Sequence, residues 1–225
     1  MTTPFLEYDV VETAENPTVS IIWMHGIGDH GSSFVPLVPE FDLSDCPPIR
    51  FIFPHAIERP VTANGGYEMS AWFDIFGDFA DDRNEDSDGV NQSKEWIEEL
   101  IAQEKERGIP ANQIFLAGFS QGCAMALETA LCYPEKLAGV IGLSGYIPML
   151  GKFKERYNPA NKDVPVFYAH GTHDDVVPIF RAEAALKVMQ ELGQNVTWHE
   201  YEMPHTLCMP EIIDIGNWLR KLLAK

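Results

Sequence analysis

The segment Gly118-Phe119-Ser120-Gln121-Gly122 restricts the fold of this chain more than any other feature. It follows a short apolar run, 113–117, that is typical of a buried strand, and it precedes residues 123–131, which are typical of a helix. In the pattern G-x-S-x-G between strand and helix, the serine occupies a strained turn, and the glycines leave room for the chain to fold back. The pattern predicts that the hydroxyl of Ser120 projects above a sheet as a nucleophile.

Strands and helices alternate along the chain. Strands are predicted at 19–24, 49–53, 114–117, 138–143, 164–169 and 196–201. Helices are predicted at 89–107, 123–131, 179–192 and 211–223. This alternation is typical of an α/β fold with a mostly parallel central sheet and helices on both faces. In such sheets, active sites lie beyond the carboxyl ends of the strands.

The chain has 225 residues and no linker-like segment, so we expect a single domain over residues 1–225. Its formal net charge is −18, which disfavours nucleic acid or an anionic membrane surface as a partner because phosphate repels an acidic body. Neutral or weakly polar substrates suit this charge better. We expect a monomer or a weak homodimer.

The start of the chain lacks the layout of a signal peptide, and no apolar run reaches about 18 residues. We therefore expect a cytoplasmic protein without stable membrane insertion. The four cysteines have no C-x-x-C spacing, and in a reducing compartment they are expected to be free thiols: Cys46, Cys123, Cys132 and Cys208.

The predicted nucleophile needs partners, because a serine hydroxyl at its ordinary pKa is a weak nucleophile. A histidine must take its proton, and a carboxylate must orient that histidine. After Ser120, His199 lies within a predicted strand, whereas His205 lies in the loop after the last strand. We expect His205 to be the general base.

Two adjacent aspartates are candidates for the acid. Asp174 and Asp175 both lie in the loop after the predicted strand 164–169, one strand before the loop that holds His205. The order serine, acid, histidine is the chain order of α/β-hydrolases. Spacing alone leaves the choice between the two aspartates open.

The intermediate of acyl transfer carries an oxyanion, which needs two backbone N–H donors fixed in advance. One is predicted to be the amide of Gln121, which follows the nucleophile and opens a helix whose dipole favours negative charge. The other is expected from the glycine-rich loop His25–Gly31, with Ile27 as the donor. A phosphate-binding loop is disfavoured there, because the Walker pattern and its lysine are missing.

An aromatic segment, 72–79, interleaves large apolar residues with acids and a glycine. Two interpretations are open: the apolar side chains line a groove for an acyl chain, or they are ordinary core. The candidate substrate-binding residues in this segment are Trp72, Phe73, Ile75, Phe76 and Phe79.

Two candidate metal sites are disfavoured. The segment Asn84–Glu95 departs from an EF-hand calcium loop at its first position only, but a poor helix precedes it, and Asp86 serves naturally as the cap of the following helix. His170 and His173 stand near Asp174, yet no further ligand of suitable spacing accompanies them. We expect no metal and no cofactor.

Motifs along nearly the whole chain resemble the carboxylesterase and acyl-protein thioesterase family of the α/β-hydrolases, also called phospholipase/carboxylesterase. The matching segments are His25-Gly26-Ile27-Gly28-Asp29, Phe53-Pro54-His55-Ala56, Pro60-Val61-Thr62, Trp72-Phe73-Asp74, Gly108-Ile109-Pro110, Gly118-Phe119-Ser120-Gln121-Gly122 and His170-Gly171-Thr172-His173-Asp174 through Val177-Pro178. The resemblance implies an α/β-hydrolase fold and a serine esterase that needs no cofactor. It implies that Asp174, the fifth residue of H-G-x-x-D, is the acid. It also supports His205 and the amides of Ile27 and Gln121, and it places the segment 72–76 beside the acyl site.

The substrates implied by this resemblance are small acyl esters or thioesters, with acylated proteins and lysolipids as further candidates. The alternatives are a lysophospholipase and a catalytically silent binding protein, and the latter predicts a damaged triad. Two departures stand out: Cys123 replaces the second glycine usual after Ser-Gln-Gly, and Glu68 and Ser70 flank Met69 before the Trp-Phe-Asp motif. We expect Cys123 to be a small buried residue. Because the second departure lies beside the expected acyl site, the family's substrate preference is not assigned to this chain.

Overall fold

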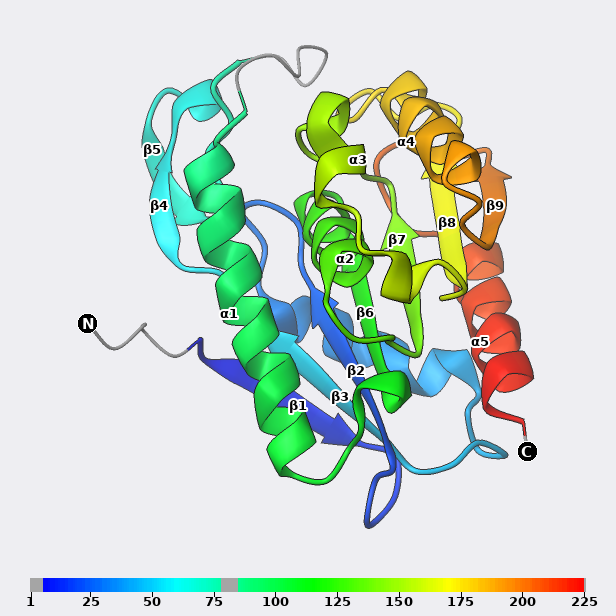
Figure 1. Cartoon of the computed structure of the whole chain (residues 1–225). Coiled ribbons are helices and arrows are strands. Elements are labelled where there is room, and N and C mark those ends of the chain that lie inside the picture. Colours follow the sequence, from blue (N-terminus) through cyan, green and yellow to red (C-terminus); the bar gives the residue numbers. More distant parts are fainter. Residues whose placement is uncertain (1–5, 78–84, 225) are drawn as a thin grey trace.

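A seven-stranded sheet forms the centre of the structure, a computed structural model that describes residues 6–77 and 85–224 (Figure 1). The order in space is β1-β3-β2-β6-β7-β8-β9, and only β1 and β3 pair antiparallel. The predicted α/β fold with a mostly parallel sheet is confirmed. The strands of this sheet are β1 (Tyr8–Glu12), β2 (Val19–Met24), β3 (Ile49–Pro54), β6 (Ile114–Phe119), β7 (Gly139–Leu143), β8 (Val166–Gly171) and β9 (Val196–Tyr201).

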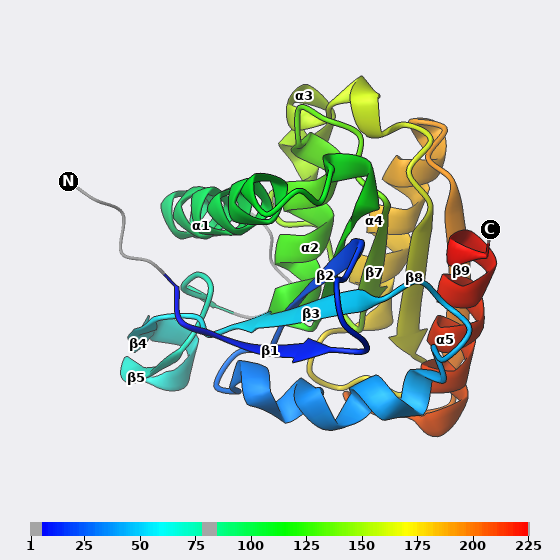
Figure 2. The same cartoon turned by 90° about the horizontal axis from the view of Figure 1, so that it is seen from below.

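Helices cover both faces of the sheet, as the view from below shows (Figure 2). One face packs against α1 (Ser87–Glu106), α2 (Gln121–Cys132), α3 (Phe153–Arg156) and α4 (Ile179–Glu191). The other face packs against α5 (Met209–Leu223) and the 3₁₀ helix η1 (Gly31–Phe41). Short 3₁₀ turns complete the connections: η2 (Thr62–Asn64), η4 (Ala111–Gln113), η5 (Leu150–Lys152) and η6 (Pro159–Asn161).

The central strands are mostly apolar because both of their faces are covered. All six residues of β2 are buried. Ile22 and Met24 pack into the layer of α1, α2 and α4, whereas Ile21 and Trp23 pack into the layer of η1 and α5. Neither side of such a strand can carry a polar residue without a partner, and the buried Ser20 of β2 donates to Glu104 at 2.6 Å.

Several elements were not expected from the sequence. The edge strand β1 is only half-buried, and its polar residues weaken the strand pattern. A separate hairpin of β4 (Glu58–Val61) and β5 (Tyr67–Ser70) stands beside the sheet. The helix η1 contains Pro36 and Pro39, which lack the N–H that an α-helix needs and therefore hide a helix from sequence patterns. Among the described helices, none combines the length and the apolar composition needed to cross a bilayer.

Candidate active site

Ser120 lies at the sharp turn between β6 and α2, with φ 56° and ψ −119°, a backbone conformation that is costly for a residue other than glycine. The flanking glycines make this turn possible. A Cβ on Gly118 would lie 2.2 Å from the carbonyl oxygen of Gly122, and one on Gly122 would lie 2.2 Å from the carbonyl oxygen of Met24. The strained turn and the need for both glycines agree with the sequence pattern.

A chain of hydrogen bonds joins Ser120 to His205 and Asp174. Nε2 of His205 is 2.8 Å from Oγ of Ser120, and Nδ1 of His205 is 2.7 Å from Oδ2 of Asp174. His205 comes from the loop between β9 and α5, and Asp174 from the loop between β8 and α4. Asp175 is exposed, whereas Asp174 is buried. The structure thus brings Asp174, and not its neighbour, to the histidine.

The environment of Asp174 favours its charged form. Burial acts to raise the pKa of Asp174, but the hydrogen bonds from His205 and from the amides of Val177 and Val176 outweigh burial, so this pKa lies below its ordinary value. A carboxylate can only accept, so Nδ1 of His205 carries the hydrogen and Nε2 presents its lone pair to the hydroxyl of Ser120. This is the tautomer that a general base requires.

The rings of Phe119 and His170 pack beside the hydrogen-bonded chain of Ser120, His205 and Asp174. Neither role was identified from the sequence. The ring of Phe119 packs on His205 with centroids 4.8 Å apart. His170 is fully buried behind the acid: its Nε2 donates to the carbonyl of Val177 at 2.8 Å and lies 3.4 Å from Oδ2 of Asp174. Burial lowers the pKa of His170 and favours the neutral ring. The available signal was a histidine at the end of a predicted buried strand.

The two loops expected to stabilise an oxyanion meet beside Ser120. A Cβ on Gly26 would lie 3.3 Å from Cβ of Ser120, so the loop that carries Ile27 passes next to the hydroxyl. Among the described residues, the amides of Ile27 and Gln121 donate to no protein acceptor. Gln121 is the first residue of α2, where a helix leaves its amides unpaired. Both amides are therefore available to a bound oxyanion.

His25 anchors the first of these loops. Its buried ring donates from Nδ1 to the carbonyl of Gly26 at 2.6 Å and accepts at Nε2 from the amide of Ala56 at 3.0 Å. Burial lowers the pKa of His25 to about 4, so the ring is neutral at neutral pH and can make both bonds. Gly28 donates to the carbonyl of Ser70 at 2.7 Å, which attaches the loop to β5. The sequence indicated His25 only as part of a motif.

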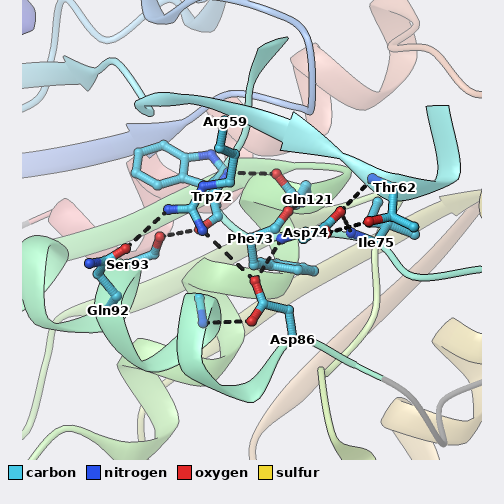
Figure 3. Close-up of polar contacts among 11 residues, drawn as sticks. Arg59, Thr62, Trp72, Phe73, Asp74, Ile75, Asp86, Gln92, Ser93 and Gln121 are labelled. Carbon is cyan, nitrogen blue, oxygen red and sulfur yellow. Dashed lines mark hydrogen bonds and ion pairs between the residues drawn. The ribbon is translucent and has the colours of Figure 1, made fainter. Parts of the chain in front are cut away.

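The side chain of Gln121 holds the aromatic segment against the nucleophile turn (Figure 3). Its Oε1 accepts from the amide of Trp72 at 2.7 Å, and its Nε2 donates to the carbonyl of Phe73 at 2.7 Å. The hydroxyl of Ser93 donates to the carbonyl of Trp72, and the amide of Asp74 donates to Asp86 at 2.9 Å. The segment from Trp72 to Asp74 is thus fixed between α2 and the start of α1.

The predicted substrate-binding residues separate into core and surface. Trp72 and Phe73 are 0% and 1% exposed, and Ile75 is 8% exposed. These three side chains are therefore part of the hydrophobic core and do not line an open groove. Phe76 is 48% exposed and is the described member of the set that is free to touch a substrate. Phe79 lies outside the described residues.

Two acids of the calcium-like segment, Asp86 and Glu85, have other partners. Asp86 caps α1 by accepting from the amide of Gly89 at 2.9 Å, which is the role that the sequence favoured. Glu85 pairs with Arg181 at 2.6 Å. Glu95 is exposed on α1, and Asn84 lies outside the described residues.

Cys123 is buried, as the sequence led us to expect. A Cβ on Gly142 would lie 3.0 Å from its Sγ, and one on Gly145 would lie 2.5 Å from its Cβ. Glycines on neighbouring segments therefore provide the space that the larger residue needs. Burial raises the pKa of the Cys123 thiol well above its ordinary value, so this sulfur is a poor nucleophile.

A buried carboxylic acid, Glu211, stands in the first turn of α5, just after the loop that carries His205. Neither of its carboxyl oxygens has a well-formed hydrogen bond among the described residues. Burial raises the pKa of Glu211 to about 8, and the nearby backbone of Cys208 offsets this only in part. Glu211 is therefore mostly protonated in the folded protein at neutral pH.

We expect Glu211 to make folding stability fall as the pH rises. Because its folded pKa lies above its unfolded value, its contribution is fully present below the unfolded pKa and is lost as the pH rises through about 8, with a total on the order of 5 kcal/mol. The variant Glu211→Gln removes this titration. Urea unfolding at about pH 5.5 and about pH 8.5 should show that the variant gains stability relative to the wild type at the higher pH.

The exposed Glu202→Gln is the matched control and should show no such gain. A difference between Glu211→Gln and the wild type that is the same at both pH values would contradict the prediction.

Comparison with known proteins places this site in a family. Residues 6–223 match the family described as Phospholipase/Carboxylesterase. The acyl-protein thioesterase 1 of Yarrowia lipolytica is 38% identical over 208 residues, which cover 91% of this chain and 92% of that protein. The acyl-protein thioesterase 1 of Debaryomyces hansenii is 35% identical over 223 residues, which cover 96% of each chain.

Solved structures agree with these relatives. SOBER1 of Arabidopsis thaliana is 30% identical, has a TM-score of 0.85, and covers 91% of this chain and 99% of its own. Acyl-protein thioesterase 2 of Zea mays is 29% identical, has a TM-score of 0.84, and covers 97% of this chain and 99% of its own. The α/β-hydrolase fold and the family resemblance are thereby confirmed. The chain belongs to the phospholipase/carboxylesterase family and is a serine hydrolase of the esterase and thioesterase class.

Proposed function

We propose that this enzyme hydrolyses carboxylic esters and thioesters through an acyl-enzyme on Ser120. The observation that carries the proposal is the continuous hydrogen-bonded chain from Ser120 through His205 to Asp174. The names of the acyl-protein thioesterase relatives favour a thioester, in a small molecule or on an acylated protein, among the substrates.

In the proposed reaction, Nε2 of His205 takes the proton of Ser120 as the oxygen attacks the acyl carbonyl carbon. The imidazolium that forms is stabilised by the carboxylate of Asp174. His205 then gives the proton to the departing alcohol or thiol, and the acyl group stays on Ser120. Water attacks this acyl-enzyme with His205 again as base, which releases the carboxylic acid and restores the hydroxyl.

The amides of Ile27 and Gln121 are the proposed donors to the oxyanion. Both lie beside the nucleophile without a protein acceptor among the described residues, and the start of α2 adds the positive end of its dipole. His25 keeps the Ile27 loop in place, and the Gln121 side chain is itself fixed by Trp72 and Phe73. Donors held in this way need no rearrangement when the charge develops.

A substrate panel tests the proposed function. Acetate, butyrate and octanoate esters and the matching thioesters should all be hydrolysed, and prior treatment with a fluorophosphonate should block every one of these activities. Hydrolysis of lysolipids alone would favour the lysophospholipase alternative. An absence of hydrolysis across the panel, with no fluorophosphonate labelling, would identify a silent binding protein and contradict the proposal.

The exposed Phe76 is the proposed contact for longer acyl chains. We expect Phe76→Ala to lower kcat/KM for an octanoate ester while an acetate ester is nearly unaffected, because only the longer chain buries CH₂ groups there. At about 0.8 kcal/mol for each CH₂, loss of contact with three of them lowers kcat/KM by roughly 50-fold. The measurement is kcat/KM for both esters together with the melting temperature.

Phe73→Ala is the matched control for this prediction, because Phe73 is 1% exposed. It should destabilise the fold by about 3–5 kcal/mol and depress activity on both esters together. If Phe76→Ala behaves in the same way, Phe76 belongs to the core and not to the acyl site.

A further inference from the structure

Three potential metal ligands that are not members of the proposed triad gather at one edge of the sheet. Asp9 lies on β1, His55 follows β3, and His30 caps the start of η1. Their ligand atoms all lie within 4.8 Å of one another. Within residues 6–77 and 85–224, this is the one group of three or more histidine, cysteine and acidic side chains so arranged. No local sequence pattern indicated this group.

The fold places these side chains on a common face. In the antiparallel pairing of β1 with β3, Asp9 stands opposite Phe53, two residues before His55, so the side chains of Asp9 and His55 point to the same side of the sheet. This is also the side that η1 covers, since Phe53 packs in its layer. His30, at the start of η1, therefore reaches the same place.

The two imidazole rings lie side by side, and one of them must turn before both can bind the same ion through Nε2. The rings of His30 and His55 stack with centroids 3.7 Å apart and an angle of 15° between their planes. Nε2 of His55 lies 3.6 Å from Oδ2 of Asp9. Nδ1 of His30 is already bonded to Ser32 at 2.8 Å, which leaves its Nε2 without a partner among the described residues.

We propose that Asp9, His30 and His55 bind a divalent transition-metal ion. Two imidazoles and one carboxylate match Zn²⁺, with water as the fourth ligand. Ligand distances of about 2.0–2.2 Å require the three donor atoms to lie roughly 3.4 Å apart. The lone pairs of two stacked rings lie in nearly parallel planes, so the ring of His30 must also turn out of the stack on His55. Asp9 is 47% exposed and His30 is exposed, so both side chains have room for these movements. The net charge of −18 adds a general attraction for cations.

Binding of the metal ion would break a hydrogen bond of the Gly31 amide. Its amide donates to Nδ1 of His55 at 3.3 Å, and a ring bound to metal through Nε2 must carry its proton on Nδ1. The proton moves from Nε2 to Nδ1, and the Gly31 amide loses its acceptor. That bond is long and weak. With three protein ligands and this exchange, the dissociation constant is expected in the micromolar range.

Titration calorimetry with ZnCl₂ on protein without a histidine tag tests the site. We expect one ion for each chain. His30→Asn keeps a capping acceptor for η1 and removes the imidazole, and Asp9→Asn removes the carboxylate; each should weaken binding at least about tenfold. Glu7→Gln is the matched control, because Glu7 is exposed, its backbone carbonyl accepts from the amide of His55 at 2.8 Å, and its side chain stands outside the ligand set. It should change the affinity less than about twofold.

Co²⁺ absorption identifies the ligands. The visible bands should indicate nitrogen and oxygen donors without thiolate charge transfer, and His30→Asn should remove them. Melting temperatures without metal show whether each variant is folded. The proposal is overturned by an absence of binding up to about 1 mM Zn²⁺, by binding that His30→Asn and Asp9→Asn leave unchanged in folded protein, or by a thiolate band.

Discussion

Replacement of Ser120 by alanine is expected to remove covalent labelling by a fluorophosphonate and nearly all hydrolysis. The hydroxyl of Ser120 is the group that His205 is placed to deprotonate, with Oγ and Nε2 2.8 Å apart. Loss of a triad member typically lowers the rate by a factor on the order of 10⁴ to 10⁶. The measurements are kcat/KM on a butyrate ester and mass spectrometry of the labelled protein.

The fold should tolerate this change well enough for the test to be clean, since alanine removes one oxygen atom from a buried position. A melting temperature near that of the wild type will show this. Ser144→Ala is a useful control, because Ser144 is another buried serine with positive φ whose hydroxyl has no partner among the described residues. Continued labelling of the Ser120→Ala variant at a different serine would defeat the assignment.

Replacement of the acid is expected to have the second largest effect. In Asp174→Asn, the amide can donate to Nδ1 of His205 and favour the tautomer with its proton on Nε2, which then cannot accept from Ser120. We expect a loss in kcat on the order of 10⁴. The amides of Val176 and Val177 still have a side-chain oxygen to bond, so the loop should keep its shape.

Asp175→Asn is the control that the chain itself offers. Asp175 has the same chemistry one residue away but is exposed, and its replacement should leave kcat nearly unchanged. Rates at several pH values, with melting temperatures for both variants, complete the comparison. Equal losses in the two variants, or a greater loss in Asp175→Asn, would rule out Asp174 as the orienting carboxylate.

The parts of the fold that follow from local pattern were predictable. Apolar runs located the central strands within a few residues, and the glycines around Ser120 indicated the sharp turn before the structure showed its φ of 56°. His205 could be predicted as the general base because active-site residues follow the carboxyl ends of parallel strands. The choice between Asp174 and Asp175 needed the family resemblance, since both lie in one loop and only burial separates them.

What could not be predicted depends on packing between distant segments. The sequence left Trp72 and Phe76 equivalent, yet the first is buried and the second is half exposed. The anchoring bonds of His25 and the position of His170 behind the acid arise from backbone groups that no local pattern identifies. The group at Asp9 depends on the pairing of β1 with β3, and the half-buried β1 was not expected as a strand.

The close packing around Cys123 affects how the enzyme should respond to peroxide. Oxidation of a thiol starts from the exposed thiolate and adds oxygen atoms that need space. The sulfur of Cys123 is sealed against Gly142 and Gly145, and burial keeps it protonated. This residue, three positions from the nucleophile, should therefore survive oxidative stress for as long as the core around it stays closed. Damage at Cys123 would then record earlier opening of the fold and would not be its cause.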